Sequence, residues 1–88
     1  MENKTAIVTG GSSGIGLAIC QRLIDRGIEV YSISRNPCRD QDTKYLHPVQ
    51  LDLSDLDAVA SFLYSFVKEK GTPDLLVNNA GYGAFYEW

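Results

Sequence analysis

Several signals that mark particular protein classes are absent from this sequence. No apolar run approaches the ~20 residues needed to span a bilayer, and residues 1–4 lead straight into a strand pattern, not a secretory signal. The eight Lys and Arg residues are scattered and the net charge is −3, so we expect no nucleic-acid partner. The absence of such an apolar run predicts no membrane association. Two cysteines do not form a disulfide framework, which predicts reduced thiols in a cytoplasmic protein.

The proportions of apolar and charged residues are ordinary for a globular domain. Apolar residues make up 44% of the chain and charged residues 22%, which excludes collagen-like and disordered classes. The 88 residues allow one small domain at most, because domains usually have ~100–200 residues. His47 is the only histidine and has no cysteine or carboxylate at ligand spacing, so we expect no metal site.

The spacing of apolar residues changes regularly along the chain. Apolar and β-branched runs predict strands at residues 4–9, 28–34, 47–53 and 74–78. Helical spacing predicts one helix over about 15–26 and a second between Ser54, its expected N-cap, and Lys70. Residues 35–43 predict a loop or a single helical turn.

This order of elements predicts an α/β fold. Strands that alternate with helices favour a parallel sheet with helices on both faces, and right-handed crossovers leave 3-2-1-4 as the expected strand order. That order describes a truncated, Rossmann-like doubly wound sheet: its first half and the first strand beyond the switch point. We therefore expect residues 1–88 to form one partial Rossmann-like domain.

Three glycines lie between the first predicted strand and the first predicted helix. Gly10, Gly14 and Gly16 stand where a phosphate needs bare backbone N–H groups and the positive end of a helix dipole. Their G-x-x-x-G-x-G spacing differs from G-x-G-x-x-G, and Leu17 replaces the lysine that a P-loop requires. The pattern favours a phosphate-binding turn, and a glycine-rich turn without a ligand is the alternative.

Three segments resemble motifs of the short-chain dehydrogenases/reductases. Residues 9–16 (TGGSSGIG) are similar to the family's cofactor loop, residues 78–81 (NNAG) to its segment after the fourth strand, and Asp52 to its adenine-recognising aspartate. The resemblance runs from about Lys4 to Gly83 and implies the N-terminal cofactor-binding portion of an NAD(P)-dependent carbonyl reductase or alcohol dehydrogenase. An Asx turn that ends a strand is the structural alternative for the paired asparagines.

The resemblance also implies roles for individual residues. The Thr9 hydroxyl would tie the glycine loop to residues 78–81, and Asp52 would accept a hydrogen bond from the adenine amine. The expected cofactor-binding residues are Gly10, Ser12, Ser13, Gly14, Ile15, Gly16, Ser34, Arg35, Asp52, Leu53, Asn79, Ala80 and Gly81.

Two residues at the end of the second predicted strand favour NADP over NAD. NAD sites usually have Asp or Glu about 20 residues past the glycine loop, to bind the ribose 2′-hydroxyl. Here that place is occupied by Ser34 and Arg35. A guanidinium can hold a 2′-phosphate in bidentate geometry, and the serine could add a donor. An ordinary exposed arginine is the alternative.

The one Y-x-x-x-K sequence, Tyr64 to Lys68, has the spacing of the family's catalytic pair but precedes the NNAG segment, whereas the family's pair follows it. We therefore assign no catalytic residue. Cys20 is predicted to be buried on the first helix. The aromatic residues within 82–88 favour packing on further structure, with a wall of a substrate pocket as the other interpretation.

The sequence ends soon after the fourth predicted strand, so we expect an N-terminal piece or a truncated product of a reductase. Such a chain would need the rest of the fold or self-association to cover its fourth strand, where leucines 75 and 76 lie on an open edge. Completed, it would act on a small carbonyl or alcohol. A catalytically inactive nucleotide-binding or oligomerising remnant is the alternative.

Overall fold

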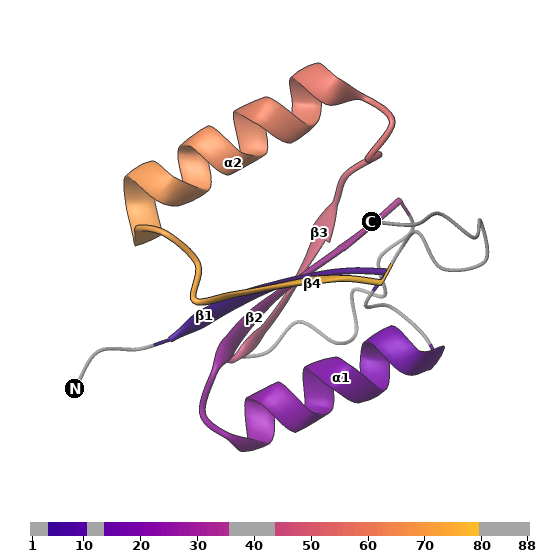
Figure 1. Ribbon diagram of the computed structural model, residues 1–88, viewed down its shortest axis with the longest axis vertical. Coiled ribbons are helices and arrows are strands. Elements are labelled where there is room, and N and C mark those ends of the chain that lie inside the picture. The colour runs from indigo at the N-terminus through magenta and orange to yellow at the C-terminus, as the bar shows by residue number, and fades with distance from the viewer. Residues whose placement is uncertain (1–3, 11–13, 36–43, 80–88) are drawn as a thin grey trace.

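The computed structural model describes residues 4–10, 14–35 and 44–79. Within them, strands and helices alternate in the order β1 (Thr5–Thr9), α1 (Gly14–Asp25), β2 (Glu29–Ser34), β3 (Leu46–Gln50), α2 (Leu56–Lys70) and β4 (Leu75–Asn78). The strands pair in parallel in the order β3-β2-β1-β4, and α1 and α2 cover opposite faces of the sheet (Figure 1). The predicted α/β, Rossmann-like doubly wound topology is therefore confirmed.

The core lies on both faces of β1 and β2. All five residues of β1 are buried, as expected for a central strand covered on both sides. Ala6 and Val8 pack with Cys20 on the α1 face, and Ile7 and Phe66 pack on the α2 face. The prediction that Cys20 is buried is confirmed, because the residue is fully inaccessible to solvent. Burial raises the pKa of its thiol, although a hydrogen bond with Ser32 partly offsets this effect.

The predicted start of the second helix is wrong by one residue. Asp55, not Ser54, is the N-cap of α2, because its Oδ1 accepts a hydrogen bond from the Ala58 N–H at 3.1 Å. Gly27 and Gly71 follow the two helices with φ of 81° and 82°, a left-handed conformation that favours glycine after a helix. No helix in the described part of the chain has both the length and the apolar character needed to cross a membrane.

The third strand also ends earlier than predicted. It stops at Gln50 instead of residue 53, because the chain turns at Asp52, whose carbonyl accepts from the Asp55 N–H at 3.0 Å. The predicted loop at 35–43 lies almost wholly outside the described residues. β4 is an edge strand of the described sheet, and its Leu76 side chain is 67% exposed.

Candidate functional site

The carboxyl ends of the four parallel strands lie together on one side of the sheet, where α1 also begins (Figure 1). This carboxyl edge is distinct from the outer strand β4. Of the expected cofactor-binding residues, Gly10, Ser34, Asp52 and Asn79 lie at or just past strand ends at this edge. In open α/β sheets, ligands bind at this edge, near the point where the strand order reverses. Four other expected residues, Ser12, Ser13, Ala80 and Gly81, lie outside the described residues.

The chain turns at Gly10, directly after β1, and α1 begins at Gly14. Gly10 has φ of 69°, which favours glycine, and its N–H donates to the Ile33 carbonyl at 2.8 Å. A Cβ on Gly16 would lie 2.0 Å from the Gly10 carbonyl oxygen and 2.8 Å from Asn79 Nδ2. The first turn of α1 is therefore pressed against the end of β1, so the positive end of its dipole lies at the edge where ligands bind.

Hydrogen bonds fasten this turn to the end of β4. Thr9 Oγ1 donates to Asn78 Oδ1 at 3.1 Å and accepts from the Asn79 N–H at 2.9 Å. Asn79 Nδ2 donates to the Gly10 carbonyl at 3.2 Å. The tie between the glycine loop and the NNAG segment is thus present, and it joins two segments that are far apart in the sequence.

Ser34 and Arg35 lie at the adjacent end of β2. Ser34 Oγ is buried without a hydrogen-bond partner in the described structure. Strand alternation places it on the α1 face with Val30, which packs in the α1-side core. Arg35 is exposed and forms no ion pair with a described residue, while its carbonyl accepts from Gln50 Nε2 at 3.2 Å. The backbone at Arg35 is fixed and its guanidinium faces solvent.

Asp52 lies beyond the end of β3. Its Oδ1 accepts from the Ser54 N–H at 2.9 Å and from Ser54 Oγ at 2.7 Å. These two hydrogen bonds, with a smaller contribution from the positive charge of Arg35, lower the pKa of the Asp52 carboxyl. The exposed carboxylate is therefore ionised and is an acceptor at neutral pH.

Sequence reasoning missed two residues of this edge, Gln50 and Ser54. The interval of two residues between Asp52 and Ser54 is typical of an Asx turn and could have indicated the second of them. Nothing in the sequence pairs Gln50 with Arg35, because that contact depends on the register of β2 and β3. The remaining expected residues, Gly14, Ile15 and Leu53, are exposed beside the turns at this edge.

The Y-x-x-x-K pair lies elsewhere. Tyr64 and Lys68 are on α2, with Lys68 Nζ 5.8 Å from the centre of the tyrosine ring. They line an open hollow of about 470 Å³ together with Leu63 and Val67. The hollow has few polar groups and shares no residue with the strand ends, so the edge with convergent polar groups is the better candidate site.

Comparison with known proteins shows to which family the chain belongs. Residues 4–87 match the family model for short chain dehydrogenase. The chain belongs to the short-chain dehydrogenase family. A curated relative, short-chain dehydrogenase TIC 32 A of Brassica napus, is 40% identical over 90 residues, which cover 91% of this chain and 28% of that protein. A probable NADP-dependent dehydrogenase of Haemophilus influenzae is 37% identical over 92% of this chain and 34% of its own length.

Solved structures agree with this membership. Aldohexose dehydrogenase of Thermoplasma acidophilum, in ligand-free form, superposes with a TM-score of 0.76 and 36% sequence identity over 89% of this chain. The superposition covers 29% of that dehydrogenase. This short-chain dehydrogenase chain thus spans about a third of the length of the relatives that it matches. The Haemophilus relative is described as NADP-dependent, and another similar solved structure, 4-hydroxyisoleucine dehydrogenase, is a complex with NADH.

Proposed function

We propose that this chain supplies the cofactor-binding part of an NADP(H)-dependent oxidoreductase that acts on a small carbonyl or alcohol. The observation that carries the proposal is the meeting of a glycine turn, a helix N-terminus and an uncommitted guanidinium at one edge of the sheet. These are the groups that a dinucleotide with an extra phosphate requires.

The residues at this edge fit such a cofactor. Gly10 and Gly14 carry no side chain at the α1 N-terminus, and a Cβ at Gly14 would meet no atom within 4 Å, so there is room for a pyrophosphate. The Ser34 hydroxyl is buried on the α1 face and has no partner among the described residues, and a bound phosphate or ribose oxygen would provide an acceptor for it. Bound nicotinamide would supply hydride chemistry, and the protein would bind and orient it.

Each residue then has a defined binding role in this proposal. The glycine turn, with Ile15 beside it, holds the pyrophosphate and the nicotinamide side. Asp52 accepts from the adenine amine, with Leu53 next to the base. Asn79 borders the adenosine ribose, and Ser34 and Arg35 bind the 2′-phosphate. The preference for NADP is supported by the arginine and by the similarity to the NADP-dependent Haemophilus relative, and NAD is the alternative.

Reversal of the charge at Arg35 tests the proposal. Arg35→Asp removes the bidentate pair and repels the 2′-phosphate, so NADPH binding should weaken by about 2–4 kcal/mol while NADH binding changes little. Arg26→Asp, an exposed arginine on the amino side of β2, is the matched control for a change in net charge. Titration of both cofactors into all three proteins measures the effect. Unchanged NADPH affinity in Arg35→Asp would reject the assignment.

We expect no turnover from the 88 residues alone, because the Y-x-x-x-K pair, Tyr64 and Lys68, lies on α2 and precedes the NNAG segment instead of following it. The check is carbonyl reduction by the purified chain and by Tyr64→Phe. Activity that the wild-type chain shows and Tyr64→Phe loses would contradict this expectation.

A second candidate role is assembly, and the exposed apolar side chains of β4 favour it. Leu75 and Leu76 are 42% and 67% exposed on an edge strand, and such strands pair readily with other strands. In this role a second copy of the chain would cover β4 by isologous pairing. Light scattering at micromolar concentration distinguishes a dimer from a 9.7 kDa monomer, and a monomer would reject the role.

A further inference from the structure

The Ser54 side chain has an unexpected partner. A serine just before a helix usually caps it, but here Asp55 occupies that position and accepts from the Ala58 N–H. The Ser54 hydroxyl therefore remains available to donate, and it donates to Asp52 Oδ1 at 2.7 Å. The Ser54 backbone N–H donates to the same oxygen at 2.9 Å.

We propose that Ser54 is a positioning residue that holds the Asp52 carboxylate in the orientation in which it receives the adenine amine. This inference rests on the proposed function, because it assumes that an adenine dinucleotide binds at this edge of the sheet. Both donors of Ser54 converge on Oδ1, and Oδ2 accepts no hydrogen bond from the described residues. One oxygen fixes the carboxylate and the other is left for the base.

The physical reason is preorganisation. Asp52 is exposed, and a solvated carboxylate without a partner would sample several rotamers and lose that freedom on binding. Two hydrogen bonds to one oxygen restrict both side-chain torsions before the ligand arrives. The Ser54 hydroxyl thereby raises the affinity for the cofactor without contacting it. This gain depends on the hydrogen bond between Asp52 and the adenine amine.

The geometry also separates this role from a role in folding. The turn itself is closed by the backbone, through the Asp55 N–H to Asp52 carbonyl bond at 3.0 Å, and α2 is capped by the Asp55 side chain. Ser54→Ala removes the hydroxyl and leaves both of those bonds in place. Ser54→Thr keeps a hydroxyl at the same position. Asp55→Ala removes the helix cap and leaves the Ser54 hydroxyl untouched.

The test uses the full 88-residue chain and two probes. NADP⁺ carries the adenine amine, and its hypoxanthine analogue carries a carbonyl oxygen in that place and so lacks the amine that would donate to Asp52. Dissociation constants are measured for the wild-type chain and for Ser54→Ala, Ser54→Thr, Asp55→Ala and Asp52→Ala. We expect Ser54→Ala to bind NADP⁺ about two- to tenfold more weakly than wild type, the penalty of immobilising one side chain.

The ratio of the two dissociation constants is the decisive readout. The wild-type chain should prefer NADP⁺ over the analogue, Ser54→Ala should lose part of that preference, and Ser54→Thr should keep it. Asp55→Ala should lower stability and leave the ratio unchanged. A wild-type ratio in Ser54→Ala would overturn the positioning role while the proposed function stands. Failure of the wild-type chain to bind either probe would overturn the proposed function, and this inference with it.

Discussion

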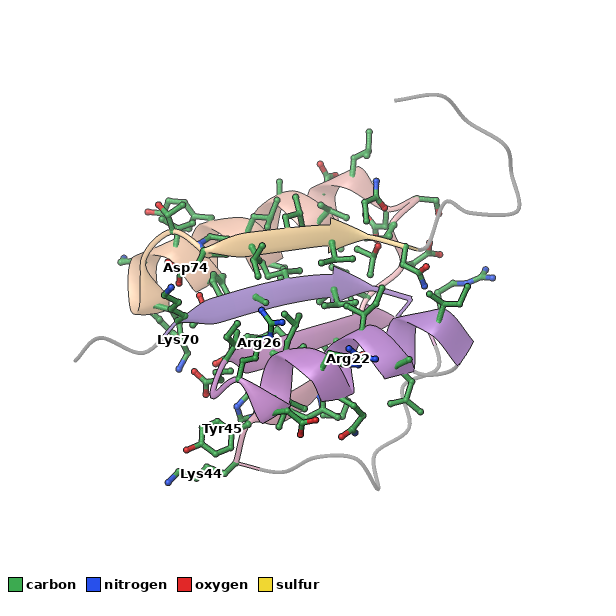
Figure 2. All side chains as sticks on the ribbon, turned by 60° about the horizontal axis from the view of Figure 1, so that its bottom comes forward. Arg22, Arg26, Lys44, Tyr45, Lys70 and Asp74 are labelled. Carbon is green, nitrogen blue, oxygen red and sulfur yellow. The ribbon has the colours of Figure 1, made fainter. Side chains whose placement is uncertain are left out.

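The polar groups at the two ends of the sheet differ in whether they bond to one another. At the amino end, His47 Nε2 lies 2.7 Å from Glu29 Oε2, and Tyr31 stacks on the histidine ring with centroids 4.8 Å apart. A hydrogen bond with Tyr31 raises the pKa of Lys70, which lies beside Asp74 at this end of the sheet in Figure 2. The polar groups of this end are thus committed to one another.

The carboxyl end differs because several of its groups have no partner among the described residues. Ser34 Oγ is buried without a hydrogen bond, Arg35 has no ion pair, and one oxygen of Asp52 accepts nothing. Buried polar groups in proteins are nearly always satisfied, so an exception needs a reason. Polar groups that bond to one another at the amino end stabilise the fold. Polar groups at the carboxyl end that have no partner among the described residues indicate a site for a ligand.

The largest effect is expected at Gly16. A Cβ there would lie 2.0 Å from the Gly10 carbonyl oxygen. Because this oxygen belongs to the backbone, the clash can be relieved only if the turn itself shifts. Gly16→Ala should lower the free energy of unfolding by about 2–4 kcal/mol and abolish cofactor binding, as urea denaturation and titration would measure. Gly27→Ala is the control, because only its φ of 81° is unfavourable and it should cost about 1–2 kcal/mol with binding intact. Equal losses in both variants would contradict the account.

The next effect is expected at Thr9, which ties the glycine turn to β4. Thr9→Val keeps the shape of the side chain but removes the acceptor of the Asn79 N–H and the donor to Asn78. Leaving a part-buried donor unsatisfied should cost about 1–3 kcal/mol in denaturant unfolding. Cofactor affinity should fall as well, since Asn79 also holds the Gly10 carbonyl. Unchanged affinity would separate this tie from the binding site.

At the amino end we expect a smaller effect, confined to stability. The side chains of Glu29 and His47 are each about a quarter exposed. Glu29→Gln weakens their contact and should lower the free energy of unfolding by about 0.5–1.5 kcal/mol. NADPH affinity should remain at the wild-type value, because these groups lie at the opposite end of the strands. Weaker NADPH binding in this variant would break the division between the two ends.

The smallest effect is a pH dependence at Asp52. Hydrogen bonds from Ser54 lower its folded pKa below the unfolded value of about 3.9. The stabilising contribution of this carboxylate is therefore present above pH 4 and is lost as the pH falls through the lowered pKa. In a carboxyl titration followed by NMR, Ser54→Ala should raise the pKa of Asp52 toward its ordinary value. An unchanged pKa would mean that the hydroxyl does not bond to the carboxylate in solution.

The element order, the strand order and the buried Cys20 could be predicted because they depend on apolar periodicity and on the handedness of crossovers. The glycine turn could be predicted because its conformation admits few residue types. The errors occurred where side chains compete for one hydrogen-bonding position. Ser54 and Asp55 are both good caps, and only the folded geometry shows that one caps α2 while the other bonds to Asp52.

Contacts across strand register were also out of reach of the sequence. The pairing of His47 with Glu29 joins β3 to β2, and the bond from Gln50 reaches the Arg35 carbonyl just past the end of β2. Their distances in sequence carry no periodic signal, since they follow from the alignment of β2 and β3. Local patterns therefore predicted the order of the elements and the burial of Cys20, but not which polar groups find partners.

The most direct test of the account is a titration of the ¹⁵N-labelled chain with NADP⁺, followed by amide chemical shifts in NMR spectra. We expect saturable changes at the carboxyl ends of the strands, at Gly10, Arg35 and Asn79. The chemical shifts of amides at the amino end, including those of Glu29 and His47, should not change. Changes confined to the amino end, or no saturable change at any amide, would contradict the claim that the uncommitted groups of the carboxyl end bind a dinucleotide.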